Sequence, residues 1–121
     1  MTFTLWVAVA GFGGVGAVAR FLLDAQVGSR VGRDFPFGTL LINLLGAFVL
    51  GALTGAGLTS DQLLVAGTAT IGSFTTFSTW MLESQRLTED GDPRGSVVNL
   101  LFSLTAGVAA AALGKTVGGA L

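Results

Sequence analysis

Hydroxyl and amide side chains are the groups in this sequence that could bind or conduct a polar species. Most of the hydroxyls gather between residues 68 and 80, in an otherwise apolar run. They are Thr68, Thr70, Ser73, Thr75, Thr76, Ser78 and Thr79, and they alternate with Phe74, Phe77 and Trp80. An ordinary helix could bond such hydroxyls back onto its preceding turn. A lipid-facing helix has no reason to hold so many, however, so the pattern also predicts that something polar binds or passes there.

A break is predicted within this run. Gly72 lies near the middle of the apolar stretch 62–82 and is followed closely by β-branched residues. Glycine and β-branched residues both weaken a helix at such a point. Broken membrane helices use their freed carbonyl oxygens to coordinate small cations, and the N-termini of their half-helices favour anions.

The remaining groups near this break are mostly hydrogen-bond donors, which suit an anion. Phe77 and Trp80 are three residues apart and share a helix face, and aromatic ring edges carry positive charge. Asn43 contributes amide hydrogens from within another apolar run, and Ser78 and Thr79 contribute hydroxyls. The less specific interpretations are packing for the aromatic pair and an interhelical hydrogen bond for Asn43.

Several kinds of chemistry are excluded by composition. The chain contains no histidine, cysteine or tyrosine, and no carboxylate lies deep in an apolar run. Arg20 and Glu83 lie at the ends of such runs, where a snorkelling anchor and a solvated helix end are the simplest interpretations. No nucleophile–base pair or metal-binding cluster can therefore be proposed, and a proton-coupled pump lacks its usual intramembrane acid.

Residues 11–16 match the dinucleotide-binding pattern G-x-G-x-x-G, and Asp34 lies at a suitable distance for a ribose-binding acid. That fingerprint requires a preceding strand and a βαβ unit. This run instead lies inside an apolar stretch long enough to span a membrane. We therefore reject nucleotide binding.

The elements that position these groups are predicted to be membrane-spanning helices. The chain has 121 residues, of which 51% are hydrophobic and 11% charged, and its charges separate apolar runs at residues 2–19, 35–60, 62–82 and 95–114. Each run has about the 20 residues needed to cross a bilayer. We expect one all-α membrane domain over residues 1–121, with four transmembrane helices near 3–23, 36–57, 62–84 and 96–115. The first helix is expected to be retained, because no convincing cleavage site follows it.

Charge and glycine content predict how these helices are oriented and packed. Arginine is concentrated in the flanks and loops at one end, with Lys115 alone at the other. The positive-inside rule then places the first and third loops in the cytoplasm and both termini outside. Four helices this short enclose little, so a second chain is expected. Glycines in the first, second and fourth helices, such as Gly16, Gly51 and Gly114, are predicted to allow close packing.

Taken in order, three segments resemble the Fluc (CrcB) family of bacterial fluoride channels. They are GGVGAVARF at 13–21, PFGTLLINLLGAF at 36–48, and GSFTTFSTW at 72–80 followed by Glu83. The segments are spread over nearly the whole chain, and the Thr-Thr-Phe-Ser-Thr core of the last one is the most specific. Two positions depart from the family pattern: Trp80 stands where a second pore phenylalanine is usual, and Ser73 where many members have glycine.

The resemblance implies a bacterial cell (inner) membrane protein that exports cytoplasmic fluoride by passive electrodiffusion and lowers fluoride toxicity. It implies an antiparallel, dual-topology dimer with two fluoride pathways at its interface and a central sodium ion. Carried over by position, the backbone carbonyls of Gly72 and Thr75 hold sodium. The fluoride pathway takes in Asn43, Phe77, Trp80, Ser78 and Thr79, and Arg20 and Glu83 belong to the vestibule or support it. The second chain is either another copy or a homologous chain of opposite orientation, and the one-sided arginines favour a fixed orientation.

Two other functions fit parts of the sequence. A small four-helix coupled cation or multidrug transporter also uses antiparallel dimers, but it requires an embedded carboxylate in the first helix. A membrane scaffold would explain the small residues as packing positions, but it leaves the Gly72 break and the clustered donors unexplained.

Overall fold

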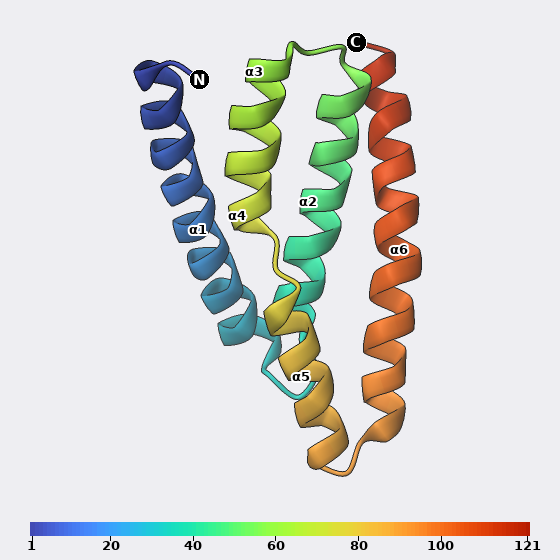
Figure 1. Cartoon of the computed structure of the whole chain (residues 1–121). Coiled ribbons are helices and arrows are strands. Elements are labelled where there is room, and N and C mark those ends of the chain that lie inside the picture. Colours follow the sequence, from blue (N-terminus) through green and yellow to red (C-terminus); the bar gives the residue numbers. More distant parts are fainter.

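The computed structural model describes residues 1–121, and the chain is helical along almost its whole length (Figure 1). Helix α1 spans Phe3–Val31, α2 spans Phe37–Gly55 and α6 spans Pro93–Gly119. In chain order, α2 is followed by one further rod before α6. This third rod consists of α3 (Ser60–Gln62), the π-helical segment η1 (Leu63–Ile71), α4 (Gly72–Phe74) and α5 (Ser78–Glu89). The predicted all-α fold is confirmed. Three helices, α1, α2 and α6, are each long and apolar enough to cross a membrane.

Helix α1 is longer than the sequence suggested. The helix was expected to end near residue 23, yet residues 24–31 continue it to Val31. The helix ends at Gly32, whose φ of 78° suits glycine, and the Gly32 N–H closes the last turn on the Gly28 carbonyl. At 29 residues, α1 is about 44 Å long and exceeds the roughly 30 Å hydrocarbon core. Its polar C-terminal turns therefore extend beyond the apolar layer.

Helices α2 and α6 run side by side in parallel and meet through reciprocal glycines. A Cβ on Gly51 or Gly55 of α2 would overlap a backbone carbonyl oxygen of α6, at Ala111 and Lys115 respectively. A Cβ on Gly114 or Gly118 of α6 would likewise overlap carbonyl oxygens of α2. The predicted close packing is confirmed at these positions, because only glycine lets the two backbones approach so closely.

Helix α1 packs against η1 and α4 at another close contact. A Cβ on Gly16 would overlap the Thr70 carbonyl oxygen, and the Ser73 hydroxyl donates to the Gly13 carbonyl at 2.7 Å. Gly11 and Gly14 of α1 have nothing within 4 Å of a Cβ position, so within this chain they pack against no other helix. They lie on the opposite side of the helix from Gly16, on a face that the chain itself leaves uncovered.

Successive rods alternate in direction, so α1 runs the same way as the third rod, and α2 the same way as α6. The loops after α1 and after α5 both lie towards the bottom of Figure 1, while the two termini both lie at the top, on opposite sides of the bundle. The arginine-bearing connections are therefore at one end of the bundle, as the charge pattern predicted. The third rod descends from α3 to α5 and is interrupted between α4 and α5.

Candidate functional site

The third rod is broken where the sequence predicted. Helix α4 ends at Phe74, Thr75 is extended with φ −82° and ψ 162°, and helix α5 starts again at Ser78. No backbone hydrogen bond outside the regular helices ends on the carbonyl oxygen of Gly72 or Thr75. These two carbonyl oxygens are therefore among those that the break leaves available at the end of one helical segment, and the N-terminus of α5 starts the next segment.

Asn43 of α2 bridges the break. Its Nδ2 donates to the Thr76 carbonyl oxygen, and its Oδ1 accepts from the Thr76 N–H, both at 2.9 Å. These two bonds satisfy the backbone N–H and carbonyl of Thr76, the middle one of the three residues that lie between α4 and α5. Asn43 thus has the interhelical partner that the less specific interpretation required, and that partner is the break itself. One Nδ2 hydrogen remains for another acceptor.

Hydroxyls on the two sides of the break behave differently. Before it, Thr70, Ser73 and Thr75 bond back to carbonyl oxygens of the preceding turn, as in an ordinary helix. After it, the Thr76 hydroxyl accepts from the Thr79 N–H in the first turn of α5 at 3.2 Å. The same hydroxyl lies 3.2 Å from Thr79 Oγ1 and 3.5 Å from Ser78 Oγ. Only the hydroxyls after the break form a polar cluster.

A groove of about 580 Å³ runs along the break between α2, the third rod and α6. Asn43, Gly72, Thr75, Phe77 and Trp80 all line it, so the structure brings these predicted site residues together. Ser78 and Thr79 are not among its lining residues. None of the lining residues carries a formal charge, so the groove lacks the carboxylate that a coupled cation transporter needs.

The aromatic pair forms a direct contact at this groove. The rings of Phe77 and Trp80 meet edge to face, with centroids 5.7 Å apart and planes at 83°. Phe77 is 69% exposed, an unusual position for a phenylalanine beside broken backbone. The Trp80 indole Nε1 donates to the Asn99 carbonyl oxygen of α6 at 3.3 Å. The two rings therefore differ, since one is free on the surface and the other is tethered.

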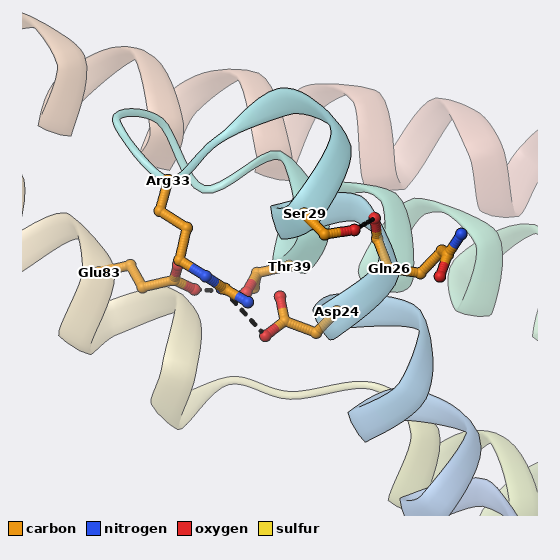
Figure 2. Close-up of polar contacts among 6 residues, drawn as sticks. All are labelled: Asp24, Gln26, Ser29, Arg33, Thr39 and Glu83. Atoms are coloured by element: carbon orange, nitrogen blue, oxygen red, sulfur yellow. Dashed lines mark hydrogen bonds and ion pairs between the residues drawn. The ribbon is translucent and has the colours of Figure 1, made fainter.

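A second hollow, of about 200 Å³, lies at the arginine-rich end of the bundle and is lined by Asp24, Arg33 and Glu83 among others. Figure 2 shows these side chains converging from α1, the loop before α2 and α5. The Thr39 hydroxyl donates to Glu83 Oε1, and Arg33 Nη1 pairs with Asp24 Oδ2 at 3.4 Å. Glu83 thus belongs to a charged pocket. Arg20, expected beside it, does not line this hollow.

Glycines make room for this charged pocket. A Cβ on Gly28 would meet the Arg33 guanidinium, and a Cβ on Gly38 would overlap Asp24 Oδ1. The two glycines let the acid and the base lie close against helices α1 and α2. The Arg33–Asp24 pair itself is well exposed and contributes little to stability.

Sequence reasoning missed Thr39 and Asn99, which organise the site, and it named Thr76 among the clustered hydroxyls without giving it a role of its own. Asn99 is 2% exposed, and its Nδ2 donates to the Ser84 hydroxyl at 2.8 Å. It could have been found by the signal that drew attention to Asn43, a lone amide in an apolar run. The bond of Thr76 could have been found from its spacing to Thr79, because a hydroxyl at the start of a helix can accept from the N–H three residues later. Thr39 offers no such local signal, because its partner Glu83 is distant in sequence.

Comparison with known proteins places this architecture in a family. The family model described as "CrcB-like protein, Camphor Resistance (CrcB)" matches residues 7–115. A protein of Mycobacterium tuberculosis named fluoride-specific ion channel FluC 2 is 48% identical over 115 residues, covering 95% of this chain and 91% of its own length. FluC 2 of Mycolicibacterium paratuberculosis is 50% identical over 114 residues, covering 94% and 93%. FluC 1 of Symbiobacterium thermophilum is 40% identical over 119 residues, covering 93% and 96%.

These matches extend over the helices and the break alike, and the relatives are named as channels rather than enzymes. The expected resemblance is confirmed, and the three apolar helices agree with a multi-pass membrane protein. This chain, with its broken third rod and the asparagine that bridges it, belongs to the CrcB family.

Proposed function

We propose that this chain forms a fluoride-specific ion channel that lets cytoplasmic fluoride leave a bacterial cell across its inner membrane. The observation that carries the proposal is the break, where an aromatic pair, an amide and the start of α5 meet in one uncharged groove. The names of relatives with up to 50% identity support the same ion. Fluoride enters cells as the neutral acid HF, dissociates, and then leaves as an anion driven by the negative inside potential.

The groups at the break suit a small anion held without a formal positive charge. The positive end of the α5 dipole, the aromatic ring edges and the free Asn43 amide hydrogen all favour negative charge. Such oriented donors replace the hydration of a small ion, and a narrow path crowds out larger ones such as chloride. Because no lysine or arginine lines the groove, nothing there traps the anion.

A second chain is part of the proposal, because the break cannot face lipid. Irregular backbone at membrane depth is tolerated only where protein or a water-filled cavity covers it. Phe77 is exposed beside the break, and Gly72 and Gly107 on the groove have nothing within 4 Å of a Cβ position. These features favour close approach by a partner, which we take to be an antiparallel second subunit.

The proposed dimer has a central sodium ion, and the chain offers suitable ligands. The carbonyl oxygens of Gly72 and Thr75 are released by the break, and both residues line the groove that the partner would cover. Neutral carbonyl oxygens suit a hard monovalent cation, whose charge would help hold the two breaks together. Gly72 and Thr75 are thus the residues we expect to hold it.

Efflux from liposomes tests the proposal directly. Vesicles loaded with fluoride and chloride and reconstituted with the purified chain should release fluoride within seconds when a potassium-valinomycin potential is applied, and should retain chloride. Protein-free vesicles provide the leak control. Release of both ions, or of neither even when a homologous chain of opposite orientation is co-reconstituted, would refute the proposed function.

A further inference from the structure

Helix α6 holds a buried amide that the proposed pathway does not use. Asn99 is 2% exposed, and its neighbour Ser84 on α5 is 4% exposed. Burying an amide in a membrane protein is costly unless its groups are satisfied, and here they are. Asn99 Nδ2 donates to Ser84 Oγ at 2.8 Å, and Asn99 Oδ1 lies 3.4 Å from Ser103 Oγ. The network therefore links α6 to α5.

Both branches of the network end on Trp80. Ser84, while accepting from Asn99, donates to the Trp80 backbone carbonyl at 2.8 Å. The backbone carbonyl of Asn99 accepts from the indole Nε1 of Trp80 at 3.3 Å. Asn99 therefore bonds the Trp80 ring through its backbone carbonyl, and its side chain is linked to the Trp80 backbone through Ser84. The ring so held is the one that meets Phe77 edge to face at the groove.

The indole N–H is the strongest hydrogen-bond donor that an aromatic ring in this groove could offer an anion. A hydrogen bond from an N–H to an ion is about twice as strong as one between neutral groups. Conduction needs binding that is weak enough for the ion to leave. A free indole N–H beside Phe77 would hold fluoride and slow its passage, whereas the C–H edge of the ring would not.

We propose that Asn99 is a positioning residue that holds the Trp80 ring so that its C–H edge, and not its N–H, faces the anion. Together with Ser84 it keeps the indole N–H bonded to a backbone carbonyl, so the anion meets only the carbon edge of the ring. This inference rests on the proposed fluoride conduction. The bond at 3.3 Å is slightly longer than the usual range, so a small shift of α5 against α6 suffices to release it.

A mutant cycle of Asn99 and Trp80 tests the proposal by flux. Asn99→Leu removes the bond to Ser84 with a side chain of similar size, and should slow fluoride efflux about tenfold by freeing the indole N–H. Trp80→Phe removes the N–H, so the double variant Asn99→Leu/Trp80→Phe should recover most of the lost efflux. Ser84→Ala breaks the same connection from the other side and should behave like Asn99→Leu. Thr116→Val, which removes an exposed hydroxyl bonded within α6, is the matched control and should conduct normally.

The indole resonance provides a second readout that a merely structural role would not move. In a Trp6→Phe protein, Trp80 is the single tryptophan, so its ¹⁵N-labelled indole N–H is observed alone. Its resonance should not respond to fluoride while the network is intact. After Asn99→Leu it should shift with added fluoride and not with chloride.

Two results would overturn the inference while leaving the channel itself intact. One is a fluoride-dependent indole shift in the Trp6→Phe protein, which would make the N–H a ligand. The other is equal loss of efflux in Asn99→Leu and in the double variant, which would make Asn99 only structural. Absence of fluoride efflux from the unmodified protein would instead refute the proposed function, and this inference with it.

Discussion

Replacing Asn43 by leucine removes both hydrogen bonds that join α2 to the break at Thr76 and keeps a side chain of similar size. The Thr76 N–H and carbonyl are then left without partners. If water reaches the break, each lost bond costs about 0.6 kcal/mol, as for interhelical bonds in other membrane proteins, or about 1 kcal/mol for both. If water is excluded, each unpaired backbone group costs about 1–3 kcal/mol, or up to about 6 kcal/mol for both. We therefore expect a loss of about 1–6 kcal/mol in the free energy of unfolding.

The same change should reduce fluoride efflux at least tenfold. Thr76 directly precedes Phe77, so loss of its anchor lets the exposed ring and the start of α5 move. A displacement of about 1 Å at a binding group is enough to spoil its geometry. Equilibrium unfolding in mixed detergent micelles measures the stability, and liposome efflux measures the flux.

Thr54→Val is the matched control for Asn43→Leu. Thr54 lies on the same helix and bonds only to the Leu50 carbonyl of the preceding turn. Both its stability and its flux should stay close to those of the unmodified chain. If Asn43→Leu changed the free energy of unfolding no more than Thr54→Val does, the role of Asn43 as the anchor of the break would be wrong.

Three further predictions concern packing, the aromatic pair and the cation. Gly118→Val should destabilise the fold by more than about 3 kcal/mol, because a Cβ at this position overlaps the Ala52 carbonyl. Gly14→Val, which has open space around it, is the control and should be tolerated. Comparable unfolding curves for the two variants would contradict the close α2–α6 contact. Phe77→Ile should abolish fluoride efflux yet leave stability nearly unchanged, since the ring is 69% exposed, and intact efflux from the folded variant would contradict the aromatic pathway. Replacing sodium by N-methylglucamine during purification and assay should lower fluoride efflux, and readdition of sodium should restore it; equal efflux in both media would contradict a sodium site at the break.

Local sequence was sufficient to predict that the chain forms helices and where the third rod breaks. Apolar runs of about 20 residues can satisfy their backbone in a bilayer only as helices, so their existence follows from composition. Gly72 and the β-branched residues after it weaken the third rod by local sterics, and the chain does leave the helix at Thr75. The contact of Phe77 with Trp80 also follows from short spacing along the chain.

Helix length at a polar boundary was less predictable. Residues 24–31 read as a polar connection, but Arg33 folds back over Gly28 to pair with Asp24, and α1 continues. The Gly32 turn that ends the helix requires a positive φ, which glycine allows but does not demand. The sequence therefore permitted this end without specifying it.

What the tertiary structure alone decided is which polar group meets which. Asn43 and Asn99 are both amides in apolar runs, and the sequence does not distinguish them. One amide bridges the broken backbone at Thr76, and the other donates to the Ser84 hydroxyl on α5. Likewise, Gly16 faces a neighbouring helix while Gly14 faces outward. A buried polar group must find a partner, and a glycine permits close approach, but the choice of partner depends on how the helices rotate and pack against one another.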